Sequence, residues 1–282
     1  MKIPILVSYA VLKGSGRILT YVEKHPDSFE IIIDSGAYSA LTRGLVVTVE
    51  EYSEWITTFN PKVQCNGFFQ LDVIYDQQKT KENLALHEKL GVKVIPVFTY
   101  ASCPEEIKLL NHYISTYPYI GCGGVRKKRN YAHWLLQQCT DSSKVHLFAF
   151  SNPSLLNCYK PKSCDHSTWL VNGMKFGKIM TQDMGFHQEK KINFSLIQRL
   201  GIQEKDYDKL NDPEWRHGKN KYLSLSIPYA LSVGAYIKQM VALKKIGTTM
   251  YFVIVDNTQS EVLDLCYQYF IEQKPIDLFR KD

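Results

Sequence analysis

Short apolar runs alternate along the first part of the chain with longer stretches whose apolar residues recur at helical spacing. The short runs are typical of buried strands, and the longer stretches are typical of amphipathic helices. The predicted strands are Ile3–Ser8, Glu30–Ile33, Gly67–Leu71, Lys93–Phe98, Tyr119–Gly121, Val145–Phe150 and Lys162–Cys164. The predicted helices are Thr48–Phe59, Lys79–Leu90, Pro104–Tyr117, Tyr131–Cys139 and Pro153–Tyr159, and Thr48 is a candidate cap for the first.

Repeated strand–helix units imply a parallel sheet, which is either closed into a barrel or open and doubly wound. A spacing of about 20–35 residues per unit suits a TIM (β/α)8 barrel. No GxGxxG or GxxxxGK[ST] motif follows any predicted strand, and this disfavours a nucleotide-binding open sheet. We therefore predict an α/β TIM barrel, with the open sheet as the alternative.

The rhythm changes after Trp169. We expect the eighth strand near Phe176–Thr181, a polar excursion at Asp206–Lys221 and a long helix at Ile227–Lys245. One more strand is predicted at Tyr251–Val255, and a closing helix at Glu261–Gln273. The simplest description is a single domain over residues 1–282 with a decorated C-terminal third, in which residues 190–282 add helices.

Length and composition agree with one folded domain, since 282 residues are typical of one α/β barrel, although two smaller domains remain an alternative. A hydrophobic content of 45% and a charged content of 22% are ordinary for a soluble protein. The net charge of +6 gives weak support to a nucleic-acid partner. The seven cysteines form no CxxC pair, so we expect reduced thiols and no zinc ribbon.

The apolar N-terminus is short and lacks a small-residue cleavage site, so it is interpreted as a buried strand and not as a signal peptide. No stretch reaches the roughly 20 apolar residues that a membrane-spanning helix needs. We expect a protein that stays in the cytoplasm and has no membrane partner.

Three aspartates directly follow predicted strands: Asp34, Asp72 and Asp165. In a TIM barrel the functional residues lie at the C-terminal ends of strands, so these carboxylates are candidates for acid–base work, nucleophilic attack or metal binding. The alternative for each is a capping role at the start of the following helix, since aspartate is a favoured N-cap.

The residues around the first two aspartates suit a planar ligand. Small residues Ser35 and Gly36 let the backbone approach a ligand closely, and Tyr38 can stack on a flat ring or pack in the core. The Asp72 carboxylate can accept two hydrogen bonds from an amidine-like edge, such as the N1–H and exocyclic amine of guanine. Gln70 alternates with Asp72, so in a regular strand both side chains point the same way. Asp76 is interpreted as a solvent-facing or capping residue.

A glycine turn follows the strand at Tyr119–Gly121. Gly123 and Gly124 can expose backbone groups to the polar edge of a ligand, or they can form a plain tight turn. A basic run comes next, and it is either a phosphate-binding site or a solvated charge run. Its members are Arg126, Lys127, Lys128 and Arg129.

Asp165 stands at a late strand end, beside His166, Ser167 and Trp169. A carboxylate in this position is a candidate nucleophile toward an anomeric carbon. His166 is a candidate for a site role, although a histidine in such a position is more often structural or exposed to solvent.

The order of these motifs resembles the tRNA-guanine transglycosylase superfamily, and most closely its short phage-type members that insert 7-deazaguanines into DNA. The resemblance covers residues 30–170. It is carried by the runs DSGAYS from Asp34, LDV from Leu71, GGV from Gly123, LFAFSNPSLL from Leu147 and CDHSTW from Cys164.

Two departures from the family pattern bear on the substrate. Members that act on tRNA carry a CxCxxC…H zinc site after the nucleophile strand, and here the one cysteine beyond Cys164 is Cys266. The zinc subdomain is therefore expected to be missing, which favours DNA over tRNA. Ala37 and Ser39 replace a glycine and a glutamine of the family motif, so some contacts to the base must differ.

The resemblance implies a base-exchange pentosyltransferase. Asp165 attacks C1′ of the target nucleotide, guanine leaves, and a 7-deazaguanine such as preQ0 enters and gives up its N9 proton to Asp34 as general base. Asp72, Gln70 and the Gly123–Gly124 backbone would read the base edge. Tyr38 or Phe98 would stack on the base, and the basic run from Arg126 would grip phosphates. No metal or redox cofactor is required.

Other readings remain open. The substrate can be tRNA despite the missing zinc motif, or the chain can be a non-catalytic barrel that binds nucleic acid. An unrelated TIM-barrel hydrolase can use Asp34, Asp72 and His166 as a metal site. A homodimer is one alternative for the oligomeric state.

Overall fold

The computed structural model describes residues 1–14, 17–100, 104–124, 130–170, 179–180, 186–187, 201–207, 227–276 and 278. It contains two compact units, each of which is described by itself. The first unit comprises Met1–His166 and Leu243–Asn257, and the second comprises Ser167–Ala242 and Thr258–Asp282.

An eight-stranded sheet forms the centre of the first unit, and every neighbouring pair of its strands is parallel. The strand order is β3-β2-β1-β10-β7-β6-β5-β4. The strands are β1 (Ile3–Ser8), β2 (Phe29–Asp34), β3 (Gln64–Phe68), β4 (Val97–Phe98), β5 (Ile120–Cys122), β6 (Val145–Leu147), β7 (Ser163–His166) and β10 (Thr249–Ile254). Strands β1 to β3 and β4 to β7 each lie beside their neighbours in the chain, β10 joins β7 to β1, and β3 and β4 are the two edge strands.

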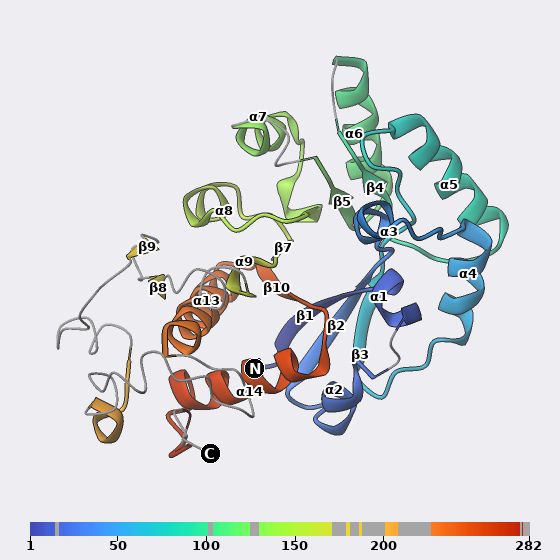
Figure 1. Ribbon diagram of the computed structural model, residues 1–282. Coiled ribbons are helices and arrows are strands. Elements are labelled where there is room, and N and C mark those ends of the chain that lie inside the picture. Colours follow the sequence, from blue (N-terminus) through green and yellow to red (C-terminus); the bar gives the residue numbers. More distant parts are fainter. Residues whose placement is uncertain are drawn as a thin grey trace. The chain divides into compact units, whose positions relative to one another are not determined.

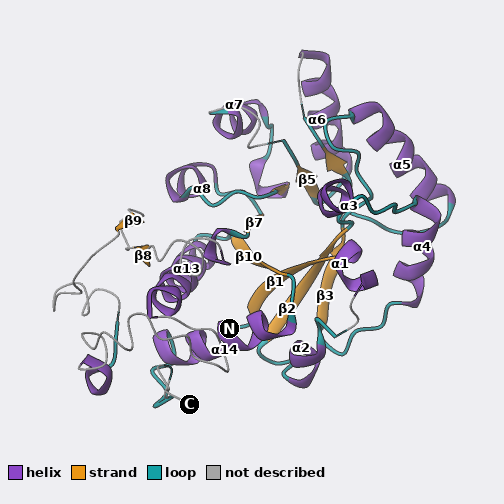
Figure 2. Cartoon of the chain, viewed as in Figure 1, coloured by secondary structure: helices purple, strands orange, loops and turns teal. Residues whose placement is uncertain are grey.

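The two edge strands meet at one point. Phe69 and Ile95 form an isolated parallel bridge just beyond β3 and just before β4. The Ile95 N–H donates to the Phe68 carbonyl at 2.7 Å, and the Gln70 N–H donates to the Ile95 carbonyl at 3.0 Å. The sheet is thus curled until its edges meet at this bridge, although it is not closed along the full length of the two strands (Figures 1 and 2).

Helices connect the strands of the first unit, and α4, α5 and α6 lie along the outer side of the sheet (Figure 1). The helices are α1 (Tyr9–Gly14), α2 (Thr20–Lys24), α3 (Ala37–Arg43), α4 (Val49–Thr58), α5 (Gln77–Lys89), α6 (Pro104–Thr116), α7 (Tyr131–Gln138) and α8 (Pro153–Tyr159). Local chemistry sets their ends: the Thr48 hydroxyl accepts a hydrogen bond from the Glu51 N–H and caps α4, as predicted.

One side of the curled sheet is filled with apolar side chains from strands that are far apart in the sheet. Leu6, Ile32, Phe69, Val97 and Tyr251 form one buried cluster. Residues from so many strands can only meet on the concave side of the curl. Burial of each such side chain stabilises the fold by about 1.5–3 kcal/mol, so the interior is a packed core and not a pore.

The C-terminal third differs from the prediction in one respect. The eighth strand of the sheet is β10 at Thr249–Ile254, whereas Ile179–Met180 (β8) pairs antiparallel with Phe186–His187 (β9) outside the sheet. The expectation of an eighth strand near Phe176–Thr181 was therefore wrong, and the strand predicted at Tyr251–Val255 takes that place. The polar excursion at Asp206–Lys221 lies largely outside the described residues.

The second unit contains α9 (Thr168–Leu170), most of α13 (Ile227–Lys245) and α14 (Asn257–Phe270). A Cβ added to Gly234 on α13 would lie 2.5 Å from the Phe270 ring, so the glycine lets α13 and α14 pack closely. The Tyr269 hydroxyl donates to Asp206 Oδ2 at 2.7 Å and accepts from the Gln203 N–H at 2.9 Å. These contacts tie the segment before α13 to α14.

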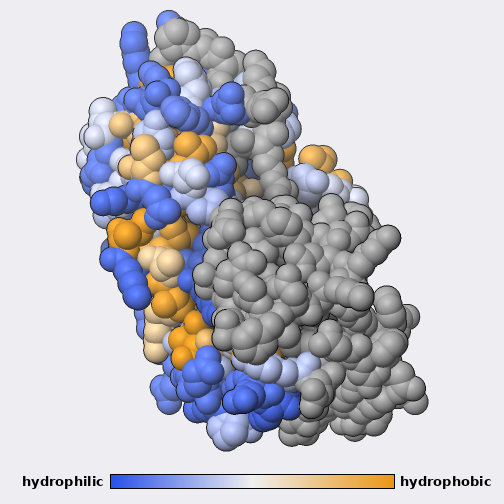
Figure 3. All heavy atoms as spheres, turned by 90° about the vertical axis from the view of Figure 1, so that its left-hand side faces the viewer, coloured by the Kyte–Doolittle hydropathy of each residue, from blue (hydrophilic) through white to orange (hydrophobic). Residues whose placement is uncertain are grey.

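The surface carries few large hydrophobic side chains in the described part of the chain, and the most exposed lie close together in sequence. Tyr38, Leu41 and Val46 are 67%, 68% and 77% exposed. On the face drawn in Figure 3, hydrophilic residues border the hydrophobic ones.

None of the helices among the described residues combines the length and apolarity that a membrane span requires.

Gly121 on β5 provides a test of the packed interior. A Cβ at this position would lie 2.6 Å from the Phe148 ring and 3.1 Å from the Phe69 ring. We expect Gly121→Ala to lower the free energy of unfolding by about 1–3 kcal/mol through overpacking, measured by denaturant titration. Gly14→Ala is the control, because a Cβ at Gly14 meets nothing within 4 Å. Equal stability of the two variants would contradict this packing.

Candidate active site

Three carboxylates lie at the C-terminal ends of the strands in the first unit. Asp34 ends β2, Asp165 is the third residue of β7, and Asp72 follows the bridge that extends β3. Asp34 is two residues beyond Ile32 of the interior cluster, so its side chain faces the concave side. The charges of both Asp72 and Asp165 raise the pKa of Asp34. The structure therefore brings the three predicted aspartates into one electrostatic site.

The Asp34 carboxyl group holds its proton unusually firmly. Burial, followed by the charges of Asp72 and Asp165, raises its pKa to about 8. The Gly36 N–H donates to Asp34 Oδ2 at 3.0 Å and opposes this rise only in part. Asp34 is consequently protonated for the most part at neutral pH, in contrast to an ordinary aspartate.

Asp72 titrates at lower pH than Asp34. Burial raises its pKa to about 6, and hydrogen bonds from its own backbone and from Ser35 lower it. The Ser35 hydroxyl lies 3.4 Å from Asp72 Oδ1, which is a long contact. Ser35 and Asp72 are thus neighbours across β2 and β3, and two neighbouring carboxyl groups of the site have different proton affinities.

Polar side chains of α5 hold the segment that carries Asp72. The Leu71 N–H donates to His87 Nε2 at 3.3 Å, and Asn83 donates to the Leu71 carbonyl at 2.9 Å. Because His87 Nε2 accepts, its Nδ1 carries the proton and donates to Ser53 Oγ at 2.8 Å. Burial lowers the pKa of His87 to about 4, which keeps the ring in this neutral form.

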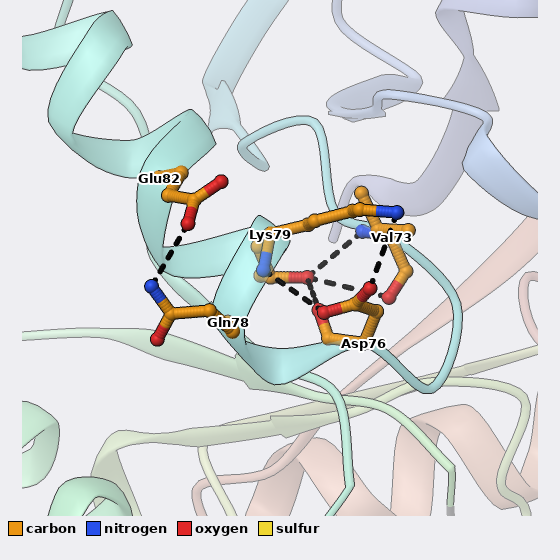
Figure 4. A network of polar contacts seen from close by, with 6 residues as sticks. Val73, Asp76, Gln78, Lys79 and Glu82 are labelled. Atoms are coloured by element: carbon orange, nitrogen blue, oxygen red, sulfur yellow. Dashed lines mark hydrogen bonds and ion pairs between the residues drawn. The ribbon is translucent and has the colours of Figure 1, made fainter.

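The start of α5 is fixed by Asp76 (Figure 4). The Lys79 N–H donates to Asp76 Oδ1 at 3.0 Å, and Asp76 Oδ2 lies 3.6 Å from Lys79 Nζ. The Asp76 N–H donates to the Val73 carbonyl at 2.9 Å, which closes the turn after Asp72. Asp76 is therefore the cap of α5, which is one of the two roles predicted for it, and its N–H fixes the turn between Asp72 and α5.

Gln70 is not brought to the carboxylates. Its Nε2 donates to the Thr80 carbonyl at 2.7 Å, and its Oε1 accepts from the Val97 N–H at 2.9 Å. Phe69 faces the interior, so the next side chain faces α5. The regular strand ends at Phe68, and the expected alternation of Gln70 with Asp72 does not continue to the site.

Asp165 is nearly buried and firmly held. Its Oδ1 accepts from the Ala149 N–H at 3.0 Å and lies 3.0 Å from His146 Nε2. His146, which is fully buried on β6, was not among the residues predicted from the sequence. Its signal was a polar residue inside the apolar run Val145–Phe150, on the strand that pairs with the strand of Asp165.

Glycines allow close approach at two places near the strand ends. Gly36 has a φ of 81°, and a Cβ there would lie 2.1 Å from the Ser8 hydroxyl. Gly124 has a φ of 68°, and a Cβ there would lie 2.6 Å from the Thr99 carbonyl. The Gly123 N–H donates to the Phe98 carbonyl at 2.8 Å, so this group is already used within the sheet.

Two of the remaining predicted residues, Phe98 and His166, face away from the side of the sheet that carries the carboxylates. Phe98 is fully buried next to the interior residue Val97 and faces the opposite side of β4. His166 is fully buried with its ring 5.7 Å from that of Phe252, and it alternates with Asp165 on β7. Tyr38 lies on α3 with its ring exposed. The predicted phosphate-binding run, Arg126, Lys127, Lys128 and Arg129, lies outside the described residues.

Among the described residues, no group of three or more His, Cys, Asp or Glu side chains is placed to hold a metal ion.

Comparison of the chain with protein-family models, curated proteins and solved structures found no match. The geometry of the carboxylates is thus the basis for any functional conclusion.

The raised pKa of Asp34 predicts a pH-dependent stability. The folded-state pKa of about 8 exceeds the ordinary value of 3.8, so the contribution of Asp34 to stability is complete below pH 3.8 and is lost as pH rises through about 8. We expect Asp34→Asn to be more stable than wild type at pH 8–9, on the order of 2 kcal/mol, with a smaller difference at pH 5.

The measurement is thermal or denaturant unfolding across this pH range. Asp141→Asn is the matched control, because hydrogen bonds from Ser143 lower the pKa of the exposed Asp141. This control should show no gain in stability at high pH. A pH-independent difference between Asp34→Asn and wild type would show that Asp34 titrates normally.

Proposed function

We propose that this protein is a base-exchange pentosyltransferase that replaces guanine in DNA with a 7-deazaguanine of the preQ0 type. One observation carries the proposal: three carboxylates lie at the strand ends of a curled parallel sheet, and the charges of Asp72 and Asp165 raise the pKa of Asp34 while Asp165 is held by hydrogen bonds. Glycosyl transfer through a covalent intermediate needs one carboxylate to attack and another group to move a proton.

The scaffold suits this chemistry. We infer a TIM barrel in which β10 is the eighth strand and the Phe69–Ile95 bridge is the seam, since the strand order then follows the chain around the barrel. Functional residues of such barrels lie at the C-terminal ends of the strands. Asp34, Asp72 and Asp165 all lie there.

The first step breaks the bond between the sugar and guanine. Asp165 is the nucleophile, because its Oδ1 is held by His146 and the Ala149 N–H. An oxygen of Asp165 bonds to C1′, the C1′–N9 bond breaks, and the electron pair goes to the base. Asp34, which is protonated at neutral pH, gives its proton to the departing guanine.

The second step reverses the roles. The N9–H of the incoming 7-deazaguanine gives its proton to the Asp34 carboxylate, and N9 bonds to C1′. The bond between Asp165 and C1′ breaks, and the electron pair returns to the Asp165 carboxylate. The pKa of about 8 lets Asp34 donate in one step and accept in the other near neutral pH.

Recognition of the base is assigned to Asp72 and Ser35, which lie together beside Asp34. Tyr38 has an exposed ring for stacking on a base outside the duplex. The basic run from Arg126 to Arg129 would contact flanking phosphates. DNA is favoured over tRNA because the sequence lacks the CxCxxC…H zinc motif, and the proposed place of action is the cytoplasm.

Replacement of Asp165 tests the proposal. We expect purified wild type to exchange labelled guanine into duplex DNA, and Asp165→Ala to lose roughly 1000-fold or more of this rate. Wild type should also form a covalent adduct with DNA that survives denaturation, and Asp165→Ala should not. Nucleoside mass spectrometry of the DNA identifies the inserted base.

Two controls complete this test. Asp141→Asn alters an aspartate that caps a short 3-10 helix away from the carboxylates, so it should keep full activity. The same assay on tRNA separates the two substrates: exchange on tRNA alone would replace DNA by tRNA. Absence of exchange on both nucleic acids would favour a non-catalytic binding barrel and overturn the proposal.

A further inference from the structure

A chain of polar side chains leads through the interior of the first unit to Asp165. The Tyr119 hydroxyl lies 2.6 Å from Ser163 Oγ, and Ser163 Oγ lies 2.7 Å from His146 Nδ1. His146 Nε2 in turn lies 3.0 Å from Asp165 Oδ1. These residues come from β6, β7 and the position just before β5, which are neighbours in the sheet (Figure 1).

Aromatic rings enclose the middle of this chain. The His146 side chain is fully buried, and the rings of Phe69 and Phe148 both have centroids 4.7 Å from it. The Tyr251 ring lies 6.1 Å away. In such apolar surroundings a polar atom without a hydrogen bond costs free energy. The donor or acceptor role of each group in the chain therefore fixes the role of its neighbour.

The direction of each hydrogen bond follows from Asp165. An ionised carboxylate only accepts, so His146 Nε2 must carry a proton. In the neutral imidazole with its proton on Nε2, Nδ1 accepts from the Ser163 hydroxyl, and Ser163 Oγ accepts from the Tyr119 hydroxyl. Each hydroxyl group and the ring N–H of the chain then donates once, with Tyr119 as the terminal donor.

We propose that Tyr119, Ser163 and His146 are positioning residues that hold Oδ1 of Asp165, so that Oδ2 is the atom that attacks the sugar. This inference rests on the proposed function. The Ala149 N–H is the second donor to Oδ1. Two fixed donors on one oxygen orient the carboxylate and leave the other oxygen as the nucleophile.

The same donors act again when the intermediate breaks down. In the glycosyl-enzyme, Oδ2 is bonded to C1′ and Oδ1 is the carbonyl oxygen of the ester. As the Oδ2–C1′ bond breaks, the electron pair returns to the carboxylate and half of the new negative charge lies on Oδ1. The His146 N–H stabilises that charge, so its loss slows the departure of Asp165 more than the attack.

Substitution of His146 separates positioning from structure. His146→Phe keeps an aromatic ring between Phe69 and Phe148 but removes the donor. We expect exchange to fall roughly 10- to 100-fold, while the fraction of enzyme trapped as covalent adduct at steady state rises. His146→Gln restores a donor and should return exchange to within about 10-fold of wild type. A lower rate without a larger adduct fraction would overturn the inference.

Two tyrosines provide a matched pair that leaves the packing almost unchanged. Tyr119→Phe removes the terminal donor of the chain, and we expect about 3- to 10-fold slower exchange with a larger adduct fraction. Tyr251→Phe removes a hydroxyl that pairs with Asn66 and not with the chain. It should leave both quantities unchanged, and equal effects of the two substitutions would contradict the proposed chain.

A readout that needs no activity distinguishes this inference from the proposed function. In NMR spectra of protein labelled at the histidine ring nitrogens, we expect His146 to carry its proton on Nε2 alone. Asp165→Asn should shift this resonance, and Asp141→Asn should not. If His146 ignores Asp165→Asn, the chain is wrong. If His146 responds but wild type forms no adduct with DNA or tRNA, the proposed function and the catalytic role both fail, and only the hydrogen-bond chain stands.

Discussion

Repulsion of the buried Asp34 carboxylate by the charges of Asp72 and Asp165 is the constraint on which the candidate site depends. Burial disfavours the charged form of Asp34, and the charges of Asp72 and Asp165 disfavour it further. The site lowers this cost by keeping a proton near neutral pH. The surroundings of the carboxyl groups differ, and so do their roles. Asp34 holds a proton, whereas Asp165 accepts hydrogen bonds from its neighbours.

Hydrogen bonds from the surrounding structure hold each carboxylate in place against this repulsion. Asp34 is fixed by the Gly36 N–H at the start of α3, and Asp72 follows a segment that His87 and Asn83 bind from α5. Asp165 is fixed by the Ala149 N–H and His146. Much of this support comes from backbone groups and buried side chains, which have little freedom to relax when the charges change.

The sequence predicted the elements that local patterns determine. The bounds of β1, α8 and α13 agree with the predicted ranges, and Thr48 and Asp76 cap helices as expected. The eighth strand could not be placed, because no local pattern near Phe176 or Thr249 indicates which of these two segments pairs with β1. The strand-end aspartates were identified, whereas His146 was not, since a lone histidine in an apolar run has no local mark of its partner. Gln70 was misplaced because alternation ends where the strand ends.

The bridge between Phe69 and Ile95 has a consequence for the motions of the sheet. Two backbone hydrogen bonds and the side chain of Gln70 join the edges there, whereas β1 and β2 pair along six residues. Local opening requires the least free energy where the fewest bonds must break together, so this join should exchange its amide hydrogens earlier than the β1–β2 ladder. The residues that follow it lead directly to Asp72, so the part of the sheet nearest that carboxylate is the part that opens most easily.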